Sequence, residues 1–183
     1  MQKANGDLNG DGKGDIALAV GRLRISDTCE RCAYERLVIV IKGAAKKGYE
    51  LLAVSPHVIM CSRCGNAGRD PFVCVKIEKN DLIVEQETAG GSSWTCTRTF
   101  RYIDKDLYLA HLTHNKWYDH GYCDSLDDNR DMEHTDLDLI TGRRYRKTIS
   151  LNCELIADDV DSVEVRPLIR LERYIGRYFD SRE

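Results

Sequence analysis

Residues 94–102, from Trp94 to Tyr102, read WTCTRTFRY, and this stretch decides the fold class. Two kinds of side chain alternate along it, so an extended chain would carry one kind on each face. One face would hold Trp94, Cys96, Arg98, Phe100 and Tyr102, and the other Thr95, Thr97, Thr99 and Arg101. A period of two that persists over the whole stretch predicts a long β-strand.

The segments on either side repeat the order of turn and strand. Downstream, the polar residues 104–106 lead into 107–111, which read LYLAH. Upstream, residues 73–77 alternate in the same way, and the pair Asn80-Asp81 then leads into the apolar run 82–84. Strands joined by such short turns predict hairpins, and successive hairpins predict an antiparallel meander.

Further runs extend this pattern toward both ends of the chain. Apolar runs occupy 16–20, 37–41 and 49–54, and a third hairpin is expected from 136–140 through Thr141-Gly142 to 143–150. The predicted fold is therefore mainly β, an antiparallel meander whose sheets form a sandwich or part of a propeller. The mixed apolar spacing of residues 169–179 predicts a short C-terminal helix.

Length and composition restrict the protein class. The chain has 183 residues, of which 42% are hydrophobic and 31% charged, and no linker-like stretch divides it. We therefore expect one globular domain over 1–183. The net charge of −3 argues against a nucleic-acid partner, and no apolar run is long enough to predict a transmembrane helix.

An acidic, glycine-rich loop over 7–15, with the sequence DLNGDGKGD, is the strongest functional signal. Oxygen-bearing side chains stand at positions 1, 3, 5 and 9 of the loop, and Gly12 permits the sharp turn that wraps them around one point. Three carboxylates held this close repel one another unless a cation is present. The loop predicts a calcium site with Asp7, Asn9, Asp11, the backbone carbonyl of Lys13, and Asp15 as ligands.

The loop differs from an EF-hand. An EF-hand requires a bidentate Glu at its twelfth position, where this chain has Leu18, and a helix after the loop, where this chain has the strand-like run 16–20. A calcium loop that leads directly into a strand resembles the FG-GAP/VCBS repeats of extracellular β-propellers. Only one such loop occurs in the chain, so we do not expect a complete propeller.

Several short motifs follow the loop. They are Cys61 to Gly65, Asp70 to Phe72, Gly90 to Trp94, Thr99 to Tyr102, Thr135 to Asp138, and Thr141-Gly142. Together with the loop, this ordered set resembles a family of exported bacterial proteins sometimes labelled VCBS-repeat-like. The resemblance implies a periplasmic or extracellular location and a bound calcium ion. That family has no settled function, so the resemblance implies no activity.

The polar N-terminus lacks the apolar stretch of a signal peptide, and we expect a chain whose export signal has been removed.

The cysteines allow two main interpretations. Two pairs have the spacing C-x-x-C, and the others are dispersed; the eight residues are Cys29, Cys32, Cys61, Cys64, Cys74, Cys96, Cys123 and Cys153. We favour disulfides, because a calcium loop is most useful outside the cell and all eight cysteines can pair there. The alternative is a tetrahedral zinc site formed by Cys29, Cys32, Cys61 and Cys64.

A histidine- and aspartate-rich stretch over 111–134 offers a second candidate centre. Its members are His111, His114, His120 and His134, with Asp119, Asp124, Asp127 and Asp128 nearby. A metal or a catalytic group could use such residues, but no hydrolase elbow or zinc-protease motif accompanies them. A solvated acidic loop with ordinary histidines is the simpler interpretation.

The polar connection over 115–132 is long enough to predict a functional surface excursion. It carries Trp117, Tyr118, Tyr122 and Arg130, residue types that dominate binding energies at protein interfaces.

Three functions remain open at this stage. We expect a calcium-binding domain that recognises a protein or an envelope glycan, rather than an enzyme. The alternatives are a periplasmic inhibitor or immunity protein directed against a toxin or hydrolase, and a hydrolase of envelope polymer that uses the stretch 111–134.

Overall fold

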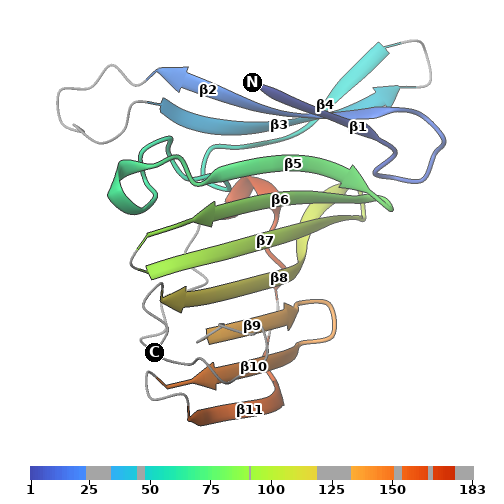
Figure 1. The fold of residues 1–183 in the computed structure, drawn as a ribbon. Helices are drawn as coiled ribbons and strands as arrows, with labels where there is room; N and C mark the ends of the chain where they lie inside the picture. Colours follow the sequence, from blue (N-terminus) through green and yellow to red (C-terminus); the bar gives the residue numbers. More distant parts are fainter. Residues whose placement is uncertain are drawn as a thin grey trace.

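The computed structural model describes residues 1–23, 34–44, 48–90, 92–118, 133–150, 154–164 and 167–175 (Figure 1). Over these residues the protein consists of two antiparallel β-sheets, and strands that follow one another in sequence lie side by side. The mainly β, meandering fold predicted from the hairpins is confirmed.

The first sheet has four strands in sequence order. They are β1 (Gln2–Gly6), β2 (Asp15–Leu23), β3 (Tyr34–Ala44) and β4 (Gly48–Ser55). The second sheet has seven strands, also in sequence order. They are β5 (Phe72–Glu78), β6 (Asp81–Thr88), β7 (Ser92–Ile103), β8 (Asp106–Tyr118), β9 (Glu133–Asp138), β10 (Arg143–Ile149) and β11 (Leu155–Ser162).

Two predicted hairpin turns are present, with a shift of one residue in the first. Lys79 and Asn80 adopt positive φ angles between β5 and β6, and Asp104 and Lys105 do the same between β7 and β8. Positive φ at both central residues is the geometry whose twist matches that of the flanking strands. These turns therefore fix the register of the centre of the second sheet.

The predicted C-terminal helix is absent over the described part of 169–179. The backbone N–H of Leu109 donates to the carbonyl of Ile169 at 2.8 Å, and Arg170 forms a β-bridge with Tyr108. These contacts hold the chain extended beside β8, and only Leu171–Arg173 forms a single 3₁₀ turn, η2. The other 3₁₀ turn, η1, covers Asn66–Gly68. No helix in the described part of the chain is long and apolar enough to cross a membrane.

The two faces of β7 separate as its sequence predicts. Cys96, Arg98 and Phe100 are buried and Trp94 is partly buried, and the core cluster that they border includes residues of both sheets. Arg98 is a charged residue on this apolar face and is only 5% exposed. Its guanidinium donates to Gln86 Oε1 and to the Tyr174 hydroxyl, each at 2.7 Å, so the buried charge is solvated by fixed polar groups.

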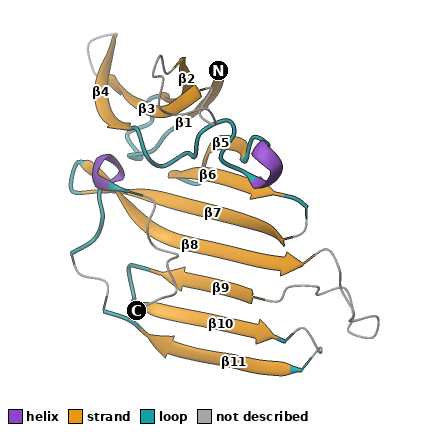
Figure 2. Ribbon diagram, turned by 90° about the vertical axis from the view of Figure 1, so that its left-hand side faces the viewer, coloured by secondary structure: helices purple, strands orange, loops and turns teal. Residues whose placement is uncertain are grey.

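The sheet continues past this core into strands that are largely charged. Figures 1 and 2 show β9, β10 and β11 extending from the body of the second sheet. Arg144 forms a two-pronged ion pair with Asp161, and Arg146 donates to Asp159 at 2.9 Å. Complementary charge across the strands therefore holds together the part of the sheet where few apolar side chains are buried.

Candidate functional site

The acidic loop 7–15 is closed by its own first residue. Asp7 Oδ1 accepts a hydrogen bond from the backbone N–H of Gly10 at 2.7 Å, and Oδ2 accepts one from Gly12 at 2.8 Å. Gly10 and Gly12 have φ angles of 71° and 78°, a region that side chains with a Cβ rarely adopt. The two glycines therefore let backbone amides turn inward toward one carboxylate.

Asp15 joins the loop to the sheet beneath it. The residue is fully buried, and its carboxylate accepts hydrogen bonds from the N–H groups of Leu8 and Gly43, both at 2.8 Å. A Cβ on Gly43 would lie 2.9 Å from the carbonyl oxygen of Gly14, so glycine is required where β3 approaches the loop. Asp15 thus has a structural role whether or not a cation is bound.

The outer half of the loop carries the accessible oxygens. Asp11 accepts a hydrogen bond from the backbone N–H of Lys13 at 2.9 Å, and its other oxygen lies 3.4 Å from Lys13 Nζ. The amide of Asn9 donates to the same carboxylate at 3.1 Å. The backbone N–H of Lys13 is the main cause that lowers the pKa of Asp11, so this carboxylate is negative at neutral pH.

The donor chemistry of the loop suits calcium, because every side chain expected as a ligand offers oxygen. The carboxylates nevertheless lie against backbone amides, and among the described residues no group of three or more His, Cys, Asp or Glu converges as a metal site. A carboxylate has about four lone-pair sites, so those engaged by amides can still accept a cation. Calcium binding stays a prediction that requires the outer residues to turn inward.

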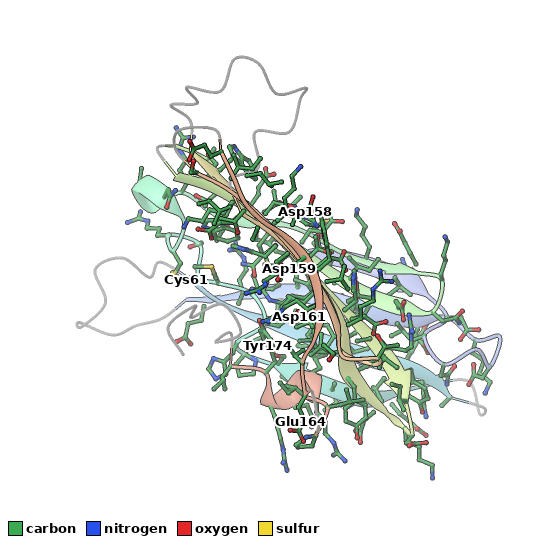
Figure 3. The ribbon with its side chains drawn as sticks, turned by 90° about the horizontal axis from the view of Figure 1, so that it is seen from below. Cys61, Asp158, Asp159, Asp161, Glu164 and Tyr174 are labelled. Atoms are coloured by element: carbon green, nitrogen blue, oxygen red, sulfur yellow. A yellow bond between two sulfur atoms is a disulfide. The ribbon has the colours of Figure 1, made fainter. Side chains whose placement is uncertain are left out.

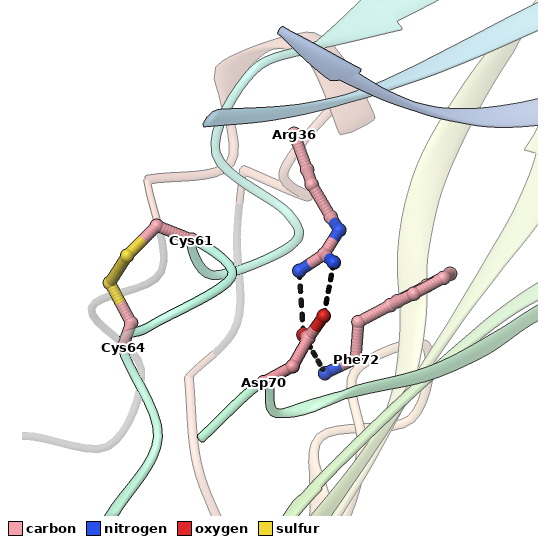
Figure 4. Close-up of a disulfide and its surroundings, with 5 residues drawn as sticks. All are labelled: Arg36, Cys61, Cys64, Asp70 and Phe72. Carbon is pink, nitrogen blue, oxygen red and sulfur yellow. Dashed lines mark hydrogen bonds and ion pairs between the residues drawn. A yellow bond between two sulfur atoms is a disulfide. The ribbon is translucent and has the colours of Figure 1, made fainter. Parts of the chain in front are cut away.

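The second cysteine pair forms a disulfide. Cys61 and Cys64 are bonded to each other in the loop that leads to β5 (Figure 4). The same loop is tied to the first sheet by Arg36, whose guanidinium pairs with both carboxylate oxygens of Asp70. Asp70 also accepts the backbone N–H of Phe72 at 3.0 Å.

Two further cysteines in the described part of the chain are free, contrary to the prediction that all eight form disulfides. Cys74 and Cys96 are free thiols, and they lie on opposite faces of the second sheet, so they cannot pair with each other. The Cys74 thiol donates to Glu85 at 3.1 Å; burial and this carboxylate raise its pKa to about 11. Burial raises the pKa of Cys96 to about 11 as well. The other predicted partners, and the first half of the zinc alternative, lie outside the described residues: Cys29, Cys32, Cys123 and Cys153.

The histidines of the stretch 111–134 do not gather into one centre over the described residues. His111 and His134 lie on one face of the second sheet, whereas His114 lies on the opposite face, close to the Trp94 ring. Burial lowers the pKa of His114 to about 4, so it is neutral at physiological pH. The other members lie outside the described residues: His120, Asp119, Asp124, Asp127 and Asp128.

The predicted aromatic excursion starts later than expected. Residues 115–118 belong to β8, and Trp117 is half-buried there, on the face that carries His111 and His134. Tyr118 is the last residue of β8, and its side chain is outside the described part, as are Tyr122 and Arg130. The part of the predicted excursion that the structure describes, residues 115–118, thus lies in a strand rather than in a loop.

That face, which we call the polar face, presents side chains of β7 to β10 that the strand register brings together. They are Thr95, Thr97 and Thr99 on β7; His111, Thr113, Asn115 and Trp117 on β8; His134, Asp136 and Asp138 on β9; and Arg143, Tyr145 and Lys147 on β10. All of those on β8 and β9 are partly exposed.

Hydrogen bonds link neighbouring strands across the polar face. His111 Nε2 lies 2.8 Å from Asp136 Oδ1, and the Asn115 amide donates to Thr95 Oγ1 at 3.0 Å. Asn115 also bonds the ring of His134, which lies 5.5 Å from the Tyr145 ring. These contacts fix the orientation of the polar groups.

The sequence did not predict the polar face as a unit, because its members are up to 52 residues apart, as Thr95 and Lys147 are. Only strand pairing brings them together.

Comparison with protein families, with curated proteins and with solved structures finds no match for this chain.

Proposed function

We propose that the protein is an exported calcium-binding β-domain that recognises an envelope glycan through the polar face. The observation that carries the proposal is the row from Thr95 through Asn115 and His134 to Tyr145, in which oriented polar groups run across four neighbouring strands. Amide, imidazole and hydroxyl groups can each donate or accept hydrogen bonds, as the many hydroxyls of a sugar chain require.

Two aromatic residues support a glycan rather than a small polar ligand. Trp117 on β8 and Tyr145 on β10 lie on the same face as the polar row. Aromatic rings supply apolar area against which the C–H groups of a sugar ring can pack, while adjacent polar groups bind its hydroxyls. An extended site on an open sheet fits a polymer better than it fits a hydrolase substrate, since hydrolysis needs a cleft with converging titratable groups.

Calcium has a supporting role in this proposal. The acidic loop precedes β2 and is tied to β3 through Asp15, so it belongs to the first sheet and not to the polar face. We therefore assign calcium to stability of the fold rather than to direct contact with the glycan.

The experiment is co-sedimentation of the purified protein with insoluble peptidoglycan, chitin and cellulose. We expect at least one polymer to retain the protein, and Asn115→Ala and Tyr145→Ala to release it while the circular dichroism spectrum is unchanged. Thr148→Ala, on the opposite face of β10, is the matched control and should bind normally. Absence of binding to all three polymers, or equal binding by the two polar-face variants, would reject glycan recognition.

A further inference from the structure

β11 is the outermost strand of the second sheet. The strand order ends at β11, and no described residue pairs with its outer edge. Figure 3 views the molecule from this side, with Asp158, Asp159 and Asp161 along the strand. An unpaired edge exposes backbone donors and acceptors that can pair with another extended chain.

The register shows which backbone groups face outward. The N–H of Val163 donates to the carbonyl of Gly142 at 2.8 Å, and this pair continues the β10–β11 register. Hydrogen-bonded pairs alternate in an antiparallel ladder, so Asp159 and Asp161 direct their backbone groups toward β10. Asp158, Val160 and Ser162 therefore direct theirs away from the sheet.

The side chains at this edge combine apolar area with negative charge. Val160 is 55% exposed and Ile156, at the register shift before it, is 66% exposed, while Asp158 lies exposed between them. One oxygen of Asp159 accepts from Arg146, and its other oxygen is buried with no hydrogen-bond partner among the described residues. The edge thus offers negative charge beside exposed apolar side chains.

Charge decides between two kinds of strand that could pair here. A second copy of β11 would bring aspartates opposite aspartates, and like charges in facing positions destabilise a strand pair. The inner neighbour β10 reads RRYRKTI, and its arginines already pair with Asp159 and Asp161. The strand β10, which pairs with the inner edge of β11, is basic. A basic strand would complement the aspartates of β11 at its outer edge as well.

We propose that β11 accepts an extended, basic segment of a partner protein as an additional strand of the second sheet. The backbone groups of Asp158, Val160 and Ser162 supply the ladder. Lysine or arginine side chains of the partner face Asp158 and Asp159, and an apolar side chain of the partner covers Val160. This site adjoins the polar face, because Val160 pairs with Tyr145 and the Tyr145 hydroxyl donates to Asp158, but it does not depend on glycan binding.

The test uses a fluorescein-labelled peptide with the sequence of β10, Arg143 to Ile149, whose binding to the intact protein is followed by fluorescence anisotropy. We expect saturable binding that weakens with salt. Two control peptides separate charge from strand pairing. One has glutamate at each basic position, and the other keeps every charge but carries N-methyl groups at alternate residues. Both should bind roughly tenfold more weakly or not at all.

Two variants at one position locate the site on the protein. Val160→Pro removes an outward N–H and leaves the bonds to β10 in place, since proline is tolerated where the N–H of an edge strand faces solvent. Val160→Thr keeps the N–H and is the matched control. Binding should be lost in the first and kept in the second. Equal binding of the N-methylated peptide would overturn the proposal, whatever Val160→Pro does to the fold. Dimerisation of the protein through β11 without peptide would also overturn it.

Discussion

At the scale of single residues, Asp15 shows how the acidic loop depends on one buried carboxylate. Its two hydrogen bonds, to Leu8 and Gly43, satisfy amides that no water can reach in the folded protein. Asp15→Ala should therefore lower the free energy of unfolding by about 2–5 kcal/mol, the cost of two buried donors left without acceptors. Urea denaturation in the presence of chelator measures this effect without a contribution from calcium.

Asp11→Ala is the matched control for that experiment. The Asp11 carboxylate bonds only residues of its own loop, and lies at the surface. The substitution should change the free energy of unfolding in chelator by no more than about 0.5 kcal/mol. If the two alanine variants are equally stable, Asp15 does not have the structural role that its contacts indicate.

His114 predicts a loss of stability in mild acid. Its pKa is about 4 in the folded protein because burial disfavours the charged ring, against 6.5 for a free histidine. Between these values the unfolded chain binds the proton and the folded protein does not, so stability falls as pH falls from 6.5 toward 4. The shift corresponds to at most about 3–4 kcal/mol, and because the residue is only partly buried, solvent reduces this to about 1–2 kcal/mol.

The measurement is urea denaturation of the protein and of His114→Gln at several pH values within that window. The variant lacks the titrating ring, so its free energy of unfolding should change less with pH. The charged groups that also act on the pKa of His114 are Glu133, Arg98 and Lys116, and they are present in both proteins. Parallel pH profiles for the two proteins would show that other groups cause the acid sensitivity.

At the scale of elements, sequence patterns predict the centre of the second sheet better than its ends. β7 can be predicted because strict alternation runs from Trp94 to Tyr102, and two-residue turns precede the strands β6 and β8. β11 has three aspartates and little apolar alternation, and it forms a strand because the basic β10 lies next to it. The extended segment at Ile169 is likewise fixed by a partner 60 residues earlier in the chain, Leu109. Contacts of this kind leave no local periodicity to detect.

The candidate functional residues likewise include a local part that the sequence predicts and a non-local part that it does not. The acidic loop is local, so its glycines and carboxylates predict a turn that the structure contains. The polar face arises from strand pairing between distant segments, and Asn115 and Tyr145 carry no sequence signal of their own. Cys74 and Cys96 show the converse: an even cysteine count predicts disulfides, but both thiols are free, and their positions on opposite faces of the sheet keep them from pairing with each other.

The charged hairpin of β10 and β11 should open independently of the core. Asp161 accepts both prongs of Arg144 and also lies 3.8 Å from Arg146, so Asp161→Asn weakens two charge pairs at once. We expect amide hydrogen exchange in β10 and β11 to become several-fold faster, with little change in β6 and β7. High salt should produce the same change in the unaltered protein, because it screens exposed ion pairs. Uniform acceleration over the whole second sheet would contradict a separate opening of the hairpin.

At the scale of the whole molecule, the loop connects two parts of the fold, so a bound ion would stabilise more than the loop itself. Asp15 ties the loop to β3, and Asn80, in the turn after β5, donates to the carbonyl of Asp7 at 2.7 Å. The loop therefore contacts both sheets. A cation that fixes the loop favours the folded state of the complete protein over the unfolded chain.

Calcium should accordingly raise the unfolding temperature, and the expected size follows from mass action. An ion that binds only the folded state contributes about 2.7 kcal/mol at a concentration one hundred times its dissociation constant. For a chain of this length, each kcal/mol corresponds to roughly 2–4 °C. Differential scanning calorimetry in calcium and in chelator measures the shift directly.

Asn9→Ala and Asp11→Ala should abolish the shift and leave the unfolding temperature in chelator nearly unchanged, because these side chains bond only within the loop. Equal unfolding temperatures of the unaltered protein in calcium and in chelator would reject the calcium site, and the loop would then be a turn closed by Asp7 and Asp15 alone.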